Sequence, residues 1–80
     1  MNENAAKRQK ILSLLYQDRQ ANASKLHQEQ WTKLATLQNA VEDLDFALSV
    51  LVELRYIERC NNLLRITGAG VLACEAGQAQ

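Results

Sequence analysis

Residues 44–70 read LDFALSVLVELRYIERCNNLLRITGAG, and this stretch decides the fold class of the chain. It opens with apolar residues at helical spacing, continues with two β-prone pentapeptides (residues 56–60 and 63–67), and ends in a second helical pattern. The pentapeptides flank Asn61 and Asn62, a pair able to adopt the positive φ angles of a tight hairpin turn. The stretch therefore predicts a helix, a two-stranded hairpin and a further helix.

The hairpin has a definite register if the turn consists of the two asparagines. Ile57 then faces Ile66, which suits a core side, and Glu58 faces Arg65, which suits an ion pair on the solvent side. Thr67 follows at once and is placed to cap the final helix. We expect that helix to end near residue 77, where a glycine stands, and residues 78–80 to form a frayed tail.

Upstream of the hairpin, the apolar spacing predicts three helices. We place the first at residues 4–19, the second at about 24–36 and the third at about 40–55. The second helix should carry three large apolar side chains inward, namely Leu26, Trp31 and Leu34. The whole of residues 1–77 then forms a single small α+β domain with three helices, a short hairpin and a C-terminal helix.

The boundary between the second and third helices allows two interpretations. Six apolar residues form a seam at alternating spacings of 3 and 4: Leu34, Leu37, Val41, Leu44, Leu48 and Leu51. This spacing would also suit one continuous helix over residues 24–55. This seam is short for a coiled coil, and Asn39 stands three residues before Glu42, as in a variant of the capping box. The sequence therefore favours a break near residue 40.

The charge balance and the residue composition bear on the classes of partner and activity that this chain could have. The nine Lys and Arg balance nine Asp and Glu, whereas strong nucleic-acid binders are more often basic. No apolar run reaches the length of a membrane span, so we expect a soluble, cytoplasmic protein. Cys60 and Cys74 are then expected to be free thiols with a structural role. With a single His27 and no catalytic constellation, we expect no metal, no cofactor, no small-molecule substrate and no enzymatic activity.

Two motifs in residues 44–70 resemble the winged-helix superfamily. There the third helix commonly ends in L-x-x-L-x-x-x-G-[LY]-I-E, and the last strand runs into L-[ST]-x-x-G. The first pattern is matched by Leu48, Leu51, Tyr56, Ile57 and Glu58, and the second by Leu64 or Ile66 with Thr67 and Gly70. Arg55 departs from the first pattern, because it occupies the usual glycine position. A left-handed backbone at Arg55 would cost about 1 kcal/mol.

The resemblance implies a small DNA-associated regulatory module. More loosely, the chain length and the lead-in LLYQDRQANASKLHQEQ resemble small winged-helix proteins of Mu-like phages and prophages. Weak contact with the DNA backbone would fall to the basic residues of the first helix, of the region after it and of the hairpin: Lys7, Arg8, Lys10, Lys25, Lys33 and Arg59.

The outward stripe of the third helix suggests an alternative, a protein-interaction or dimerisation face. Its candidates are Asp43, Phe46, Ser49, Val50 and Glu53. A simpler interpretation of the same residues also stands. The acids Glu42, Asp43 and Asp45 would merely stabilise the first turn of the helix, and Phe46 would be buried by a neighbouring element.

Overall fold

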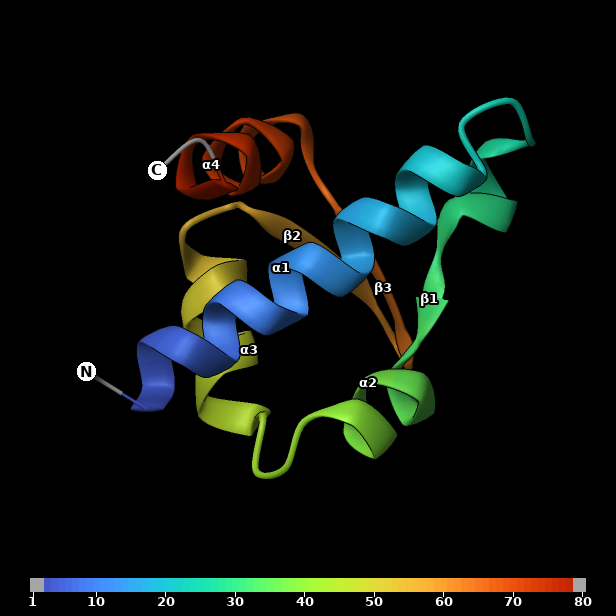
Figure 1. The fold of residues 1–80 in the computed structure, drawn as a ribbon. Helices are drawn as coiled ribbons and strands as arrows, with labels where there is room; N and C mark the ends of the chain where they lie inside the picture. The colour runs from blue at the N-terminus through green and yellow to red at the C-terminus, as the bar shows by residue number, and fades with distance from the viewer. Residues whose placement is uncertain (1–2, 79–80) are drawn as a thin grey trace.

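The computed structural model describes residues 3–78, apart from the side chains of residues 27, 28 and 78. This part of the chain is α+β, with four α-helices and one three-stranded antiparallel sheet (Figure 1). No helix within it is both long and apolar enough to cross a membrane. The elements follow in the order α1 (Glu3–Ala21), the 3₁₀ turn η1 (His27–Gln30), β1 (Thr32–Lys33), α2 (Leu34–Ala40), α3 (Asp45–Glu53), β2 (Ile57–Cys60), β3 (Leu63–Ile66) and α4 (Gly68–Gln78).

The predicted hairpin is confirmed, including its register. Ile57 pairs with Ile66 and Glu58 with Arg65 in the β2–β3 ladder. Both isoleucines are buried, as the core-side assignment requires. Asn61 takes the positive φ of the turn, 56°, which asparagine tolerates better than most residues.

The predicted second helix at residues 24–36 is wrong. That region holds a turn, η1 and the two-residue strand β1, and α2 begins only at Leu34. Thr32 pairs with Leu64 of β3, and its buried hydroxyl donates a hydrogen bond to the carboxylate of Asp18 on α1. Pairing with the sheet, together with this bond, holds the segment extended. Leu26, expected to point inward, is therefore in the loop before η1 and is 66% exposed.

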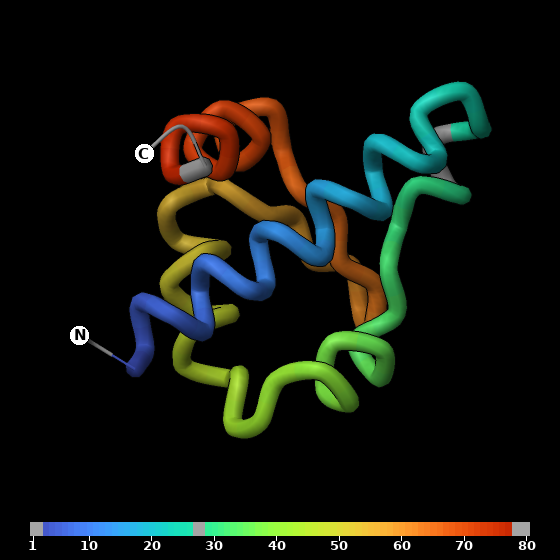
Figure 2. Tube along the Cα trace, viewed as in Figure 1, coloured from blue at the N-terminus to red at the C-terminus, as the bar shows by residue number. Residues whose placement is uncertain are grey.

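The continuous helix over residues 24–55 is also excluded, since the backbone breaks between α2 and α3. Asp43 has a φ of 48°, which no α-helix permits, and Figure 2 shows the yellow-green trace bending sharply there. The predicted start of the third helix near residue 40 is too early, because α3 begins at Asp45. Its N-cap is Leu44, without a side-chain cap hydrogen bond, so the capping box from Asn39 does not form.

Arg55 adopts the left-handed conformation that its position in the motif implies, with a φ of 66°. The amide N–H of Arg55 donates to the carbonyl of Val52 at 3.0 Å, and that of Tyr56 donates to Leu51 at 3.0 Å. These two bonds are the Schellman motif, the usual ending of a helix on a left-handed residue. The helix end is thus well formed although an arginine replaces the favoured glycine.

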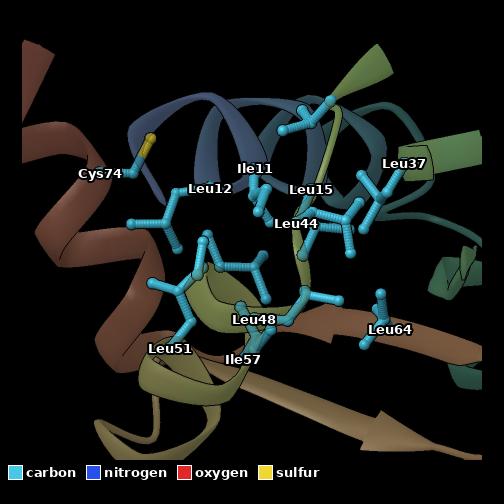
Figure 3. Packing of buried hydrophobic residues seen from close by; sticks show 13 residues of the cluster. Ile11, Leu12, Leu15, Leu37, Leu44, Leu48, Leu51, Ile57, Leu64 and Cys74 are labelled. Atoms are coloured by element: carbon cyan, nitrogen blue, oxygen red, sulfur yellow. The ribbon is translucent and has the colours of Figure 1, made fainter. Parts of the chain in front are cut away.

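The core lies between α1, α3, α4 and the inner face of the sheet (Figure 3). α1 crosses the sheet and contacts α3, α4 and β3. It contributes Ile11, Leu12 and Leu15, all buried. α2, α3 and the turn between them bury five of the six residues of the apolar seam: Leu37, Val41, Leu44, Leu48 and Leu51. The sixth, Leu34, is only partly buried.

The start of α4 is fixed by Thr67 and Gly70. The amide of Gly70 donates to Thr67 Oγ1 at 3.1 Å, which confirms the predicted cap. A Cβ on Gly70 would overlap the carbonyl oxygen of Tyr56, so this close approach requires glycine. Cys74 is buried on the inner side of α4, whereas Cys60 is exposed, and both are free thiols. The predicted frayed tail begins too early, since residue 78 still belongs to α4; residues 79 and 80 lie outside the described part.

Candidate functional site

The outward side of α3 is the surface that the sequence offered as an interaction face. Leu44, Ala47, Leu48 and Leu51 turn inward and are buried. Because a helix advances 100° per residue, Phe46, Ser49 and Glu53 lie opposite this buried stripe, while Val50 and the C-cap residue Leu54 lie along its flank. We call them the α3 face: Phe46, Ser49, Val50, Glu53 and Leu54.

Three apolar side chains form a ridge across the α3 face. Phe46, Val50 and Leu54 stand four residues apart, so they are neighbours along the helix surface. Phe46 is 60% exposed and Leu54 49% exposed, with Val50 half-buried between them. The interpretation in which a neighbouring element buries Phe46 is therefore wrong, since no element within residues 3–78 covers its ring.

Leu54 was missed by the sequence analysis. It is the C-cap residue of α3 and keeps helical angles, φ −73° and ψ −8°. Its spacing of four from Val50, the same as that of Val50 from Phe46, is the signal in the sequence that points to it. With Leu54 included, the ridge runs the full length of α3.

The charges around the ridge are mostly negative. Glu42, Asp43, Asp45 and Glu53 are all exposed. Only Asp45 lies in the first turn of α3, so the proposed stabilisation of that turn applies to Asp45 and not to Glu42 or Asp43, which precede the helix. No residue from 45 to 53 is basic. The hydroxyl of Ser49 donates to the carbonyl of Phe46 at 2.7 Å, so this proton is already used within the helix.

A hollow of about 270 Å³ opens at the N-terminal end of α3. Three of its six lining residues are acidic, two from the α2–α3 turn and one at the start of α3. The lining consists of Gln38, Val41, Glu42, Asp43, Leu44 and Asp45. Phe46, the first residue of the ridge, follows Asp45 in the chain.

The basic candidates on α1 do not all share one surface, although Lys7 and Lys10 line one hollow together with Glu42. Arg8 and Lys10 are two residues apart on a helix, so they point about 200° apart. The ammonium of Lys7 approaches the carbonyl of Asp43 at 3.5 Å and the carboxylate of Glu3 at 4.0 Å, the one ion pair among the described residues. Lys25 follows the opposite end of α1, so it lies far from Lys10 along the helix.

Lys33 and Arg59 lie instead near the tip of the sheet. Lys33 pairs with Leu63, next to the hairpin turn, and both Lys33 and Arg59 are exposed. Arg59 Nε donates to the carbonyl of Asn61 at 3.2 Å, which holds the side chain against its own turn. The two cations therefore flank the hairpin tip, on a different part of the surface from the α3 face.

Two arginines support the sheet through hydrogen bonds, and the ion pair expected between Arg65 and Glu58 does not form among the described residues. Arg19 Nη1 donates to the carbonyl of Ile66 at 2.8 Å. The guanidinium of Arg65 donates to Gln30 Oε1 at 3.3 Å from Nε and 3.1 Å from Nη2. Partial burial, together with the charge of Arg19, lowers the pKa of Arg65 below its usual range. Neither arginine stands at the α3 face.

The described residues contain no group of three His, Cys, Asp or Glu side chains that could hold a metal ion. Comparison with protein-family models, with curated proteins and with solved structures returned no match to this chain. The α3 face is thus defined by its own geometry alone, as an exposed apolar ridge with acidic surroundings.

Proposed function

We propose that this chain is a winged-helix module that binds another protein through the α3 face. The order helix, strand, helix, helix, hairpin, helix and the strand order β1-β3-β2 support the winged-helix assignment, as do the motif residues Arg55 to Glu58 in their expected places. The exposure of Phe46 carries the functional proposal. An aromatic side chain that is 60% exposed and continues into an apolar ridge is typical of a protein-binding surface.

Base reading by α3 is disfavoured on electrostatic grounds. A helix that enters the major groove normally presents Arg, Lys, Asn or Gln to bases and phosphates. Here the exposed charges on α3 are Asp45 and Glu53, which would be brought toward phosphates of the same sign. Phe46 and Val50 would occupy the positions of base-contacting residues.

A DNA-associated regulatory function remains the second candidate, favoured by Lys33 and Arg59. Both cations are exposed beside the hairpin tip, and neither is in an ion pair within the described part of the chain. Such a pair could contact the phosphate backbone without reading sequence. Binding of this kind would be weak and would fall steeply with salt.

The two functions are separated by a titration of fluorescent mixed-sequence duplex DNA, followed by anisotropy at low and at physiological salt. The α3-face function gives no salt-sensitive rise in anisotropy. Salt-sensitive binding would establish the second candidate, provided that a Lys33→Gln, Arg59→Gln double variant loses it. The Phe46→Ala variant is the matched control, since removal of an apolar side chain should leave a phosphate contact unchanged.

A further inference from the structure

We infer that the α3 face receives a basic amphipathic helix of another protein. This inference rests on the proposed function, because it names the kind of partner that the α3 face would bind. Three properties of the face carry it: the shape of the apolar ridge, the sign of the surrounding charges and the acidic hollow at one end.

The ridge has the shape of a helix-packing surface. Side chains four residues apart form the rows that interdigitate with the grooves of a second helix. From Phe46 to Leu54 the row covers eight residues, or about 12 Å of helix axis. A partner helix with apolar residues on one side would fill the spaces on either side of Phe46 and Val50, as in other helix-in-groove complexes.

The charges that surround the ridge select the sign of the partner. Between residues 42 and 55 the exposed charged groups are four carboxylates and one guanidinium, that of Arg55. None of these five groups is in an ion pair within residues 3–78. Lys7 approaches only the backbone carbonyl of Asp43, and Lys7 and Lys10 lie near Glu42 on the α1 side. A partner helix carrying Lys or Arg beside its apolar stripe would supply opposite charges on the ridge side, which favours both encounter and register.

The acidic hollow gives one of those cations a definite place. It lies at the Phe46 end of the ridge and is bounded by Glu42, Asp43 and Asp45. Its volume of about 270 Å³ is enough for the end of a lysine or arginine side chain. A cation there would lie among three acidic residues, at the end of α3 where the ridge begins.

A second copy of this chain is a poorer occupant of the same face. A two-fold dimer sets each patch against itself. In an antiparallel α3 pair, Arg55 of one copy could meet Asp45 of the other, but Glu42, Asp43 and Glu53 of each copy would have no opposite charge. A basic partner would bring positive charge, and no further negative charge, to all four carboxylates.

The test is a calorimetric titration of the full chain with a synthetic helical peptide of Leu and Lys, roughly 14 residues or four turns long. We expect saturable binding that weakens as salt is raised, and that weakens about tenfold or more in Phe46→Ala. A peptide with Glu in place of every Lys, and therefore the same apolar side, should bind at least about tenfold more weakly than the Lys peptide. Equal binding of the two peptides, or none of the Lys peptide at about 1 mM, would overturn the inference.

Two variants control for nonspecific effects. Leu72→Ala removes a side chain that is 69% exposed on α4, slightly more than Phe46 on α3, and should leave binding of the Lys peptide unchanged. The pair Asp45→Asn, Glu53→Gln keeps the ridge and should remove much of the salt dependence. If Leu72→Ala weakens binding as much as Phe46→Ala does, the peptide recognises exposed apolar surface in general and the inference is wrong.

Failure of this inference is distinguishable from failure of the proposed function. If light scattering gives a dimeric mass that Phe46→Ala returns to a monomer, the α3 face binds protein but its occupant is a second copy. The proposed function would then stand while the basic partner is rejected. Salt-sensitive DNA binding that depends on Lys33 and Arg59 would instead contradict the proposed function itself.

Discussion

The hydroxyl of Tyr16 on α1 donates a hydrogen bond of 2.8 Å to Oε2 of Glu75 on α4. The two residues are 59 positions apart in the chain, so the bond joins the first helix to the last one. It lies outside the core, and it holds together two helices whose inner sides bury Leu12 and Cys74. The same bond makes this part of the molecule sensitive to alkaline pH.

The first expectation concerns the titration of Tyr16. The hydrogen bond to the Glu75 carboxylate, aided by burial and by the negative charge, raises the pKa of Tyr16 above its ordinary value of 10.0. Because the folded-state pKa is the higher one, the contribution to stability is complete below pH 10 and is lost as the pH rises through the raised pKa. In Glu75→Gln, the Tyr16 pKa should fall toward the ordinary value, measured by tyrosinate absorbance in a Tyr56→Phe background so that Tyr16 alone contributes. An unchanged titration would show that the bond does not form in solution.

The second expectation concerns the left-handed residue at the end of α3. Arg55 has a φ of 66°, which glycine adopts without the steric cost of a Cβ. Arg55→Gly should therefore raise the free energy of unfolding by about 1 kcal/mol in urea denaturation. Arg55→Ala is the control, because it removes the charge and keeps the Cβ, and it should give no such gain. A stabilisation by alanine equal to that by glycine would trace the effect to charge.

The third expectation concerns the close approach of α4 to Tyr56. A Cβ on Gly70 would overlap the Tyr56 carbonyl oxygen and lie 2.7 Å from Ile66 Cγ1, so the backbone must shift. Gly70→Ala should lower the free energy of unfolding by about 3 kcal/mol. Gly68→Ala, two residues earlier in the same helix, has nothing within 4 Å of the added Cβ and should be neutral or slightly stabilising. Equal effects at both positions, seen in thermal unfolding, would contradict this packing.

The fourth expectation separates the two sides of α3. Leu48 is buried in the core, so Leu48→Ala should cost about 2–5 kcal/mol of unfolding free energy. Phe46 is 60% exposed, so Phe46→Ala should lower the free energy of unfolding by no more than about 0.5 kcal/mol. Urea denaturation of both variants gives the comparison. A large loss of stability in Phe46→Ala would mean that the ring supports the fold, and its use as a binding probe would then be invalid.

The features that could be predicted from sequence are those set by neighbouring residues. The β2–β3 register follows from a two-residue turn and from alternation of buried and exposed side chains, so Ile57 and Ile66 were paired correctly. The helix end at Arg55 follows from a local motif. The inward side of α3 follows from helical spacing, which placed Leu48 and Leu51 in the core.

The features that were missed depend on contacts between distant parts of the chain. β1 is only two residues long and forms because Thr32 meets Leu64 of β3 and Asp18 of α1, which no local pattern reveals. The seam of six apolar residues suggested one helix because both α2 and α3 bury residues at helical spacing. The left-handed backbone of Asp43 separates α2 from α3, but the apolar residues on both sides of it keep the spacing of one helix. Exposure of Phe46 likewise depends on which elements pack nearby.

The most direct test of the α3 face is amide chemical-shift mapping by NMR, with ¹⁵N-labelled protein titrated with the Leu/Lys peptide. The largest changes should fall on residues 42–55, centred on Phe46 and Val50, and the β2–β3 hairpin should change little. Changes concentrated on the hairpin near Lys33 and Arg59, or on α1, would contradict the α3 face as the binding surface. So would the absence of any change at peptide concentrations that saturate the calorimetric signal.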